Sequence, residues 1–397
     1  MGRRKNTRSR KMATEKIIFK NYQPLVWERF LRAKSNRRVG SAYLFTGPRG
    51  CGKEWGAIEF AKLLNCESQD AAPCNHCPSC TKFSSLQHPN MKLIVPLPAG
   101  NKSNQSLDPL DSLKKEDYEY LTEAIRIKAT EPFYKIQVPA ARRITINSVR
   151  ELRRSIYLKS LSNGRKVVII FDAHLLSEGM GESANALLKI LEEPPPNTSL
   201  ILVTDKKSAL LPTVISRCQP IIFSALSLEN IRMIMENDGI DNTLAAQAAI
   251  IAGGNVHLAK EIANYSTNDI LAEAEALAKS MTRVDEKGWR DFINTNAMTG
   301  SRRPEEFKFN IYLLQLWFHQ AYRMKTEDNT NQLLPEITKS IEKFNEIYPK
   351  ANLAEINKVL EETTQSLVRN LYIPLTLTNL LITIQELLKG KIPISVV

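Results

Sequence analysis

The feature that most constrains this chain is a glycine-rich heptapeptide, GPRGCGK at residues 47–53, which fits the spacing G-x-x-x-x-G-K. An apolar, strand-like run at 42–45 precedes it, and a helix-like stretch follows as far as Leu64. A strand, a glycine-rich loop and a helix in this order predict a P-loop, in which backbone N–H groups at the helix N-terminus surround phosphate oxygens. The candidate phosphate-binding residues are therefore Gly47, Gly50, Gly52 and Lys53, with Lys53 as the point charge.

The metal-binding half of this predicted site is defective. A hydrolysing P-loop carries Ser or Thr after its lysine to hold magnesium, whereas this chain has Glu54, which would repel phosphate unless it turned away. The second element should be a strand that ends in two acids, one for the metal shell and one for the attacking water. The apolar run 166–171 ends instead in Phe171-Asp172, so Phe171 fills a slot where a metal-shell carboxylate is expected. Two independent losses argue against hydrolysis and leave Asp172 as the remaining candidate acid.

Four of the six cysteines lie together, which points to a metal ion. The spacing is Cys66-x7-Cys74-x2-Cys77-x2-Cys80, in a chain with no visible secretory signal, so metal is favoured over disulfides. Four thiolates suit tetrahedral zinc in a closed, structural site that stabilises the short excursion 66–80 without doing chemistry. His76 is an alternative ligand, although a histidine between clustered cysteines is more often a bystander.

Composition is that of a globular protein with two or three domains: 397 residues, 43% hydrophobic and 24% charged. No apolar run reaches the roughly 18–20 residues that a membrane span needs, so we expect no membrane contact. The net charge of +12 is concentrated in residues 1–20, which hold eight basic residues and one acidic residue. We expect a basic disordered tail that touches nucleic acid or acidic partners, or else a solubilising extension or a true start at Met12.

Alternating strand-like and helix-like segments predict a parallel α/β core over 21–225. A helix that begins with a capping box, Ser148 and Glu151, precedes the strand at 166–171. The polar stretch 96–137 reads as an insertion, with one helix over 116–128 whose apolar face carries four residues. These are Tyr120, Leu121, Ala124 and Ile125. The other strand-like runs are 91–95 and 200–203, and a second helix over 185–191 is stopped by Pro194, Pro195 and Pro196.

Beyond Phe223 the strand pattern ends and helices predominate. We expect a helical lid over 226–268, broken at Gly253-Gly254 and restarted with Asn255 as N-cap. A helical domain should follow over 271–397, in which apolar residues recur with a helical period. Its buried positions are predicted to include Phe307, Ile311, Leu314, Phe318 and Ala321, and Leu377, Leu380, Leu381, Ile384 and Leu387.

Three sets of basic residues allow a functional and an ordinary interpretation. Arg217, in Ser216-Arg217-Cys218, could reach a neighbouring subunit's nucleotide as an arginine finger, or it could bind carbonyls at a helix C-terminus. His257, on the restarting helix, should be mostly neutral at pH 7 and reads best as a surface histidine. The helix with Arg150, Arg153 and Arg154 could touch DNA or could present an ordinary solvated face.

The P-loop, the cysteine excursion, the segment NALLKILEEPP at 185–195 and the Ser216-Arg217-Cys218 element together resemble the bacterial clamp-loader family, the AAA+ subunits of the DNA polymerase III holoenzyme. The resemblance covers residues 20–265 by motif. It implies an AAA+ core, a helical lid and a helical collar at 271–397 that assembles with tau/gamma and delta subunits. It also implies a cytoplasmic bacterial protein that acts with the sliding clamp and primed DNA, with structural zinc, and with ATP or ADP as a ligand but no hydrolysis.

Within this family, three departures favour the delta-prime stator group over the ATP-hydrolysing tau/gamma motors: Glu54, Phe171 before Asp172, and His257 where the motor's sensor helix has Arg. The resemblance also favours the finger role for Arg217, because that arginine completes the adjacent motor's ATP site in the family. Two alternatives stay open. One is a tau/gamma-type motor with an unusual metal shell, and the other is a zinc-bearing DNA-binding protein that keeps the AAA+ core as a scaffold.

Overall fold

The structure is a computed structural model that describes residues 18–36, 38–68, 72–98, 108–158, 163–179, 181–264, 267–283, 285–326, 334–366 and 372–391. The described chain divides into two compact units. The first unit runs to Ile240 and takes in Ala252–Lys260, and the second comprises Asp241–Ile251 and the chain from Glu261 onward. Most of the predicted basic tail, residues 1–17, lies outside the described residues.

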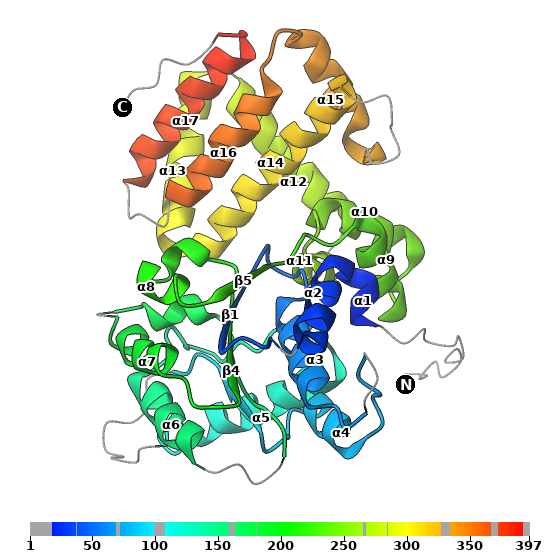
Figure 1. Cartoon of the computed structure of the whole chain (residues 1–397). Coiled ribbons are helices and arrows are strands. Elements are labelled where there is room, and N and C mark those ends of the chain that lie inside the picture. The colour runs from blue at the N-terminus through cyan, green and yellow to red at the C-terminus, as the bar shows by residue number, and fades with distance from the viewer. Residues whose placement is uncertain are drawn as a thin grey trace, which may run out of the picture. The chain divides into compact units, whose positions relative to one another are not determined.

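The first unit is built on a parallel sheet with the strand order β2-β3-β4-β1-β5. This confirms the predicted α/β core, and four of the strands match predicted runs. Figure 1 labels three of these strands, β1, β4 and β5. β5 was not predicted, because Pro220 and an exposed Ile222 hide its pattern; proline is tolerated here because β5 is an edge strand. The strands are β1 (Ala42–Thr46), β2 (Met91–Ile94), β3 (Lys166–Ile170), β4 (Thr198–Thr204) and β5 (Gln219–Ile222).

Helices cover both faces of the sheet, which explains why its central strands are continuously apolar. On one face Leu44, Ile170 and Leu202 share a core with α6 (Ile146–Tyr157), α7 (Glu182–Glu192) and α8 (Pro212–Ile215). On the other face the rings of Tyr43 and Phe45 pack against Phe60 of α3 (Lys53–Asn65) and Phe30 of α2 (Pro24–Ser35). The short helices α1 (Phe19–Tyr22), α4 (Pro78–Ser84), η1 (Ala173–Leu176) and η2 (Lys207–Ala209) complete this layer architecture.

The N-terminus of α6 differs from the prediction. The cap is Thr145, whose hydroxyl oxygen accepts a hydrogen bond from the Ser148 backbone N–H at 3.2 Å. Ser148 is buried inside the first turn, so the predicted pairing of Ser148 with Glu151 as a capping box is wrong. Thr is a favoured cap, although a somewhat weaker one than Ser, and the helix begins at Ile146, two residues before Ser148.

The predicted helix in the 96–137 insertion is confirmed as α5 (Lys115–Thr130). Leu121 and Ala124 are buried as expected, whereas Tyr120 is 41% exposed. The buried stripe continues to Lys128, whose burial was not predicted. Residues 99–107 of the insertion lie outside the described residues.

The predicted lid region contains α9 (Leu228–Asn237), α10 (Asn242–Ala252) and α11 (Val256–Ile262). Asn255 caps α11 as predicted, since its Oδ1 accepts hydrogen bonds from the backbone N–H groups of His257 (3.1 Å) and Leu258 (3.3 Å). The region is shared between the two units: α9 belongs to the first unit and most of α10 to the second. The lid boundaries 226–268 stay a prediction.

The second unit is helical throughout its described residues. Its long central helix, α14, packs against α12, α13, α15 and α16, and α17 packs against α13 and α16. The two apolar sets predicted from the helical period are buried on α14 and α17. None of the described helices is both long enough and apolar enough to span a bilayer. The bounds are α12 (Thr267–Thr282), α13 (Glu286–Arg302), α14 (Pro304–Thr326), α15 (Pro335–Ile347), α16 (Leu353–Ser366) and α17 (Ile373–Leu388).

Candidate functional site

The predicted P-loop lies between β1 and α3, in the strand–loop–helix setting that its function requires. Gly50 and Gly52 have φ values of 68° and 89°, a left-handed conformation that glycine adopts without steric cost. Lys53 is 7% exposed, and its ammonium donates to the carbonyl oxygens of Gly47 (2.8 Å) and Pro48. The structure therefore brings the predicted glycines and lysine together, with the lysine bonded to the loop's own backbone.

Glu54, at the start of α3, forms two ion pairs with lysines of the 96–137 insertion. Its Oε2 lies 2.7 Å from Lys128 Nζ, and its Oε1 lies 2.6 Å from Lys135 Nζ. Burial by itself would raise the pKa of Glu54, but the two ammonium groups outweigh burial and lower the pKa to about 2. Glu54 is thus a fully ionised, doubly paired carboxylate at neutral pH.

Lys128 is buried at the C-terminal end of α5, with a 2% exposed side chain. Besides Glu54, its ammonium donates to the carbonyl oxygens of Pro132 (3.1 Å) and Tyr134 (2.6 Å). Three acceptors match the three N–H donors of a charged lysine, whereas a neutral amine would leave one acceptor without a proton. The Nζ also lies 5.5 Å from the ring centroid of Phe171, within range of a cation–π contact.

Lys135 joins the P-loop helix to the end of β3. Its Nζ lies 2.6 Å from Glu54 Oε1 and 2.7 Å from Asp172 Oδ1. Burial opposes the charged form, but the two carboxylates outweigh it and raise the pKa of Lys135 above its ordinary value. We call Glu54, Lys128, Lys135 and Asp172 the charge cluster; it contains two negative and two positive side chains.

Sequence reasoning missed both lysines of the charge cluster. They lie 74 and 81 residues after Glu54, inside an insertion that carries no motif. One signal was available: Lys128 continues the buried stripe Leu121–Ala124 of α5 by one more helical turn. A lysine on the apolar face of an amphipathic helix is rarely buried without a partner, so its position predicts a buried carboxylate nearby.

Magnesium does not fit this site. In P-loop NTPases the ion is held by the hydroxyl after the P-loop lysine and by an acid that follows the second strand. Here Glu54 stands at the hydroxyl position with both oxygens bound to lysines, and one oxygen of Asp172 is bound to Lys135. A divalent cation would have to displace or approach two ammonium groups.

Further polar side chains surround the charge cluster. His257 is half-buried, and its burial lowers its pKa to about 4, so it is neutral at pH 7 as predicted, although it is no ordinary surface histidine. Asp205, after β4, pairs with Arg49 of the P-loop at 3.6 Å. Ligand atoms of Asp172, His174 and Asp205 lie within 4.8 Å of one another. The trio was not predicted as a group; parallel strands brought it together, because Asp172 and Asp205 each follow the carboxyl end of a neighbouring strand.

The four predicted cysteines converge at the end of α3. All four Sγ atoms lie within 4.8 Å of one another, and Cys74 Sγ and Cys80 Sγ are 4.0 Å apart. Backbone N–H groups of Cys74, Cys77 and Cys80 point at sulfur atoms of the cluster, at 3.3 to 3.4 Å. His76 lies outside the group: its ring is exposed, and its Nδ1 lies 2.8 Å from the Cys74 carbonyl oxygen.

This four-cysteine cluster fits zinc. Tetrahedral Zn–S bonds of about 2.3 Å place sulfur atoms roughly 3.8 Å apart, close to the spacing seen here. Hydrogen bonds from the backbone N–H groups of His76 and Cys77 lower the pKa of Cys74 to about 6, whereas burial raises that of Cys80. When bound, zinc would hold all four sulfurs as thiolates and close the site, with no coordination position left for a substrate.

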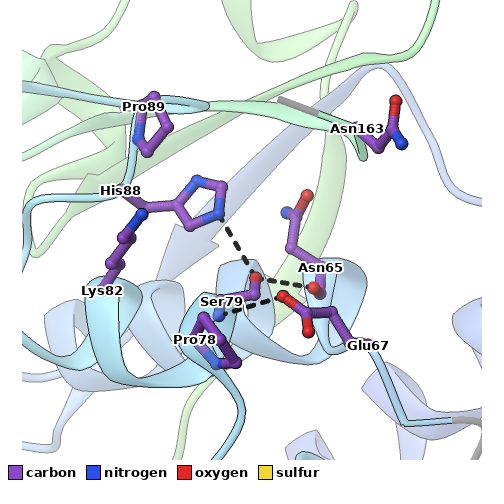
Figure 2. A pocket seen from close by; sticks show the side chains of 8 residues that line it. All are labelled: Asn65, Glu67, Pro78, Ser79, Lys82, His88, Pro89 and Asn163. Atoms are coloured by element: carbon purple, nitrogen blue, oxygen red, sulfur yellow. Dashed lines mark hydrogen bonds between the residues drawn. The ribbon is translucent and has the colours of Figure 1, made fainter. Parts of the chain in front are cut away.

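A hollow of about 270 Å³ lies beside the four-cysteine cluster, between the end of α3 and α4 (Figure 2). Its polar groups bind one another. Ser79 Oγ donates to the Asn65 carbonyl at 2.7 Å, and the Asn90 N–H donates to His88 Nδ1 at 3.0 Å. His88 Nε2–H is therefore the donor toward Ser79 Oγ at 3.3 Å, the reverse of what an activated serine needs. The hollow is lined by Asn65, Glu67, Pro78, Ser79, Lys82, His88, Pro89 and Asn163.

Arg217 follows α8 at the start of β5, and its side chain is 36% exposed. Its guanidinium donates to the Thr213 carbonyl (2.9 Å) and to Glu192 Oε1 (2.8 Å). The first contact is the helix-end carbonyl contact of the ordinary interpretation, and both partners lie within its own unit. On α6, Arg150, Arg153 and Arg154 are exposed, and their DNA contact stays a prediction.

Comparison with known proteins identifies relatives of this chain. The family model "DNA polymerase III, delta subunit" matches residues 22–227, just over half of the chain. The chain is 28% identical over 254 residues to DNA polymerase III subunit delta′ of Bacillus subtilis, covering 64% of this chain and 62% of the relative. It is 30% identical over 196 residues to subunit tau of the same organism, covering 49% and 26%. The chain thus spans less than two thirds of either relative.

Among solved structures, a DNA polymerase III gamma subunit-related protein from Thermotoga maritima aligns with 91% of this chain and 99% of its own. The TM-score is 0.33 and the sequence identity 15%.

Proposed function

The chain belongs to the DNA polymerase III delta subunit family, and from that premise we propose that it is a delta-prime type stator of the clamp loader. In this role it assembles with tau/gamma and delta subunits and helps them load the sliding clamp onto primed DNA at the expense of their ATP. The similarity to both delta′ and tau of Bacillus subtilis supports a place in such an assembly.

The observation that carries the stator role is the charge cluster. ATP hydrolysis at a P-loop depends on a magnesium ion that bridges the β- and γ-phosphates and neutralises the developing charge. The residues that would hold the ion, Glu54 and Asp172, are bound by Lys128 and Lys135 instead. The P-loop amides and Lys53 could still bind the phosphates of ATP or ADP, but without turnover.

Arg217 is the residue that we propose acts on a neighbour's nucleotide. Its pairing with Glu192 is an exposed ion pair, with side chains 36% and 49% accessible, and such pairs contribute little to stability. The guanidinium can therefore exchange Glu192 for a phosphate at small cost. The four-cysteine cluster, loaded with zinc, has a structural role in this proposal.

ATPase measurements test the stator role. The purified chain should show no ATP turnover above a P-loop-disrupted control, Lys53→Ala, with magnesium present. When mixed with tau/gamma and delta subunits from the same organism, it should co-elute with them and raise clamp loading on primed DNA. Magnesium-dependent turnover by the chain alone, abolished in Lys53→Ala, would assign it to the tau/gamma motors.

The arginine role is tested in the assembled complex. Arg217→Ala should lower the complex's ATPase by at least about tenfold, since arginine fingers contribute 10³–10⁵ in rate, while co-elution is retained. Arg232→Ala is the matched control, because Arg232 is likewise 38% exposed and paired with a glutamate, Glu229 at 2.9 Å. An unchanged ATPase in Arg217→Ala would leave Arg217 with only its helix-end contact.

A further inference from the structure

Three departures from a hydrolysing P-loop meet in one place. Glu54 replaces a hydroxyl, Phe171 replaces an acid, and the insertion supplies Lys128 and Lys135. Lys128 pairs with the new carboxylate and lies over the new aromatic ring. Each residue that departs from the hydrolysing P-loop therefore contacts another residue that departs from it. The charge cluster is thus a set of mutually compensating substitutions and not a series of unrelated losses.

We propose that Lys135 takes the structural place of the magnesium ion, as a cation tethered to the chain. In a P-loop NTPase the metal links the start of the P-loop helix to the acid after the second strand. Lys135 Nζ makes the same link: it lies 2.6 Å from Glu54 at the start of α3 and 2.7 Å from Asp172 after β3. The inference rests on the proposed non-hydrolysing role and adds the reason for it.

The charge balance supports a permanent replacement. Two carboxylates and two ammonium groups leave the charge cluster neutral, so an added divalent cation finds no net attraction. Arg49 and Asp205 form a further ion pair at 3.6 Å, which adds no net charge. Removal of Lys135 alone would leave Glu54 and Asp172 with one ammonium between them, beside His174 and Asp205, an oxygen-rich setting that hard cations prefer.

The insertion closes over the site with aromatic packing as well as charge. Phe133, which lies between the two lysines in sequence, is 4% exposed and packs edge-on against Trp55, with 5.3 Å between the ring centroids. Its ring centroid also lies 6.0 Å from that of Tyr22. This packing fixes the backbone on both sides of Phe133, so the carbonyls of Pro132 and Tyr134 meet Lys128. The backbone that carries the Lys135 ammonium is thus fixed by the packing of the folded segment around it.

Manganese binding tests the replacement directly, because Mn²⁺ takes oxygen ligands, reports by electron paramagnetic resonance and does not compete well for thiolate sites. The zinc-loaded full chain should show no Mn²⁺ site at the charge cluster. Lys135→Ala and Lys135→Met should each gain one site, with Mn²⁺ affinity at least about tenfold above that of the wild type. Lys92→Ala, which removes a lysine paired with Glu151 outside the P-loop region, should gain none.

Thermal unfolding gives a second readout, since an ion that binds only the folded chain raises its melting temperature. Magnesium should raise the melting temperature of Lys135→Met and leave that of the wild type and Lys92→Ala unchanged. The proposal is overturned if the wild type binds Mn²⁺ as tightly as the Lys135 variants, or if both folded variants gain no site. If the wild-type chain does not hydrolyse ATP, either of these outcomes leaves the stator role intact. ATP turnover by the wild type would instead contradict the stator role.

Discussion

The charge cluster and the four-cysteine cluster differ in how the charge of their grouped acidic side chains is neutralised. Each brings together several side chains that carry, or can carry, a negative charge. In the charge cluster the chain brings its own cations, because Lys128 and Lys135 come from the insertion to meet Glu54 and Asp172. The four-cysteine cluster consists of four sulfurs within 4.8 Å of one another, and we expect it to take its cation from solution.

The difference lies in how much protein surrounds each cluster. The charge cluster is enclosed by α3, α5 and the end of β3, so long side chains can be fixed at defined positions. The cysteine excursion is short, and among its described residues only Pro73, Ser79 and Cys80 are buried, so it has little core of its own and we expect its fold to depend on a metal. A buried tethered cation makes the first site insensitive to metal supply, whereas the second should respond to it.

The largest effect should follow removal of the metal at the four-cysteine cluster. Cys77→Ser should lower the zinc content from about one per chain to near zero and expose the excursion to proteolysis, because structural zinc contributes roughly 10–16 kcal/mol of binding free energy in small modules. Elemental analysis and limited proteolysis measure this. Cys218→Ser, at a buried cysteine outside the cluster, is the control and should keep its zinc. A zinc content of about one per chain in Cys77→Ser would contradict the assignment of the four-cysteine cluster as the metal site.

Next in size is the loss of the buried carboxylate. Glu54→Ser restores the residue type of a hydrolysing P-loop but leaves Lys128 buried without its counter-ion, which should lower the free energy of unfolding by about 3–5 kcal/mol. Urea denaturation of the isolated chain measures the change. The double variant Glu54→Leu with Lys128→Met removes both charges and should recover most of the loss. If Glu54→Ser were as stable as the wild type, Lys128 would not depend on Glu54.

Acid should weaken the charge cluster through Glu54. Its pKa is about 2 in the folded chain and near 4.5 when unpaired, so the stabilisation is complete above pH 4.5 and is lost as the pH falls toward 2. Between these values the wild type should lose roughly 3 kcal/mol more than Glu54→Gln, whose side chain does not titrate. The comparison of two variants cancels the loss of zinc in acid, which affects both equally. Parallel pH profiles for the two chains would contradict the ion pairing of Glu54.

The two clusters also differ in how well the sequence predicts them. The four-cysteine cluster can be predicted from the sequence because its four candidate ligands lie within fifteen positions, with a spacing typical of metal sites. The P-loop glycines, β1, α3 and β3 were likewise predictable from local pattern. The burial of Lys128 could be inferred from its place on the apolar face of α5. Lys135 and the partners of both lysines could not be inferred, because the packing of the insertion on the core is a long-range event with no spacing rule. Thr145 at the start of α6 and the edge strand β5 were missed for smaller reasons: two cap-forming residues three positions apart, and a proline that masks a strand.

The smallest effect should come from a lysine–glutamate pair that lacks enclosure. Lys92 Nζ lies 3.2 Å from Glu151 Oε1, only about half an ångström farther than the pairs of the charge cluster, but the two side chains are 43% and 24% exposed. Lys92→Ala should change the free energy of unfolding by less than about 1 kcal/mol, because solvent screens such a pair and its ordering costs side-chain entropy. Urea denaturation beside Glu54→Ser gives the contrast under one set of conditions. If Lys92→Ala lowered the free energy of unfolding as much as Glu54→Ser, burial would not determine the strength of these ion pairs. The distinction between an enclosed lysine of the charge cluster and an ordinary surface lysine would then be wrong.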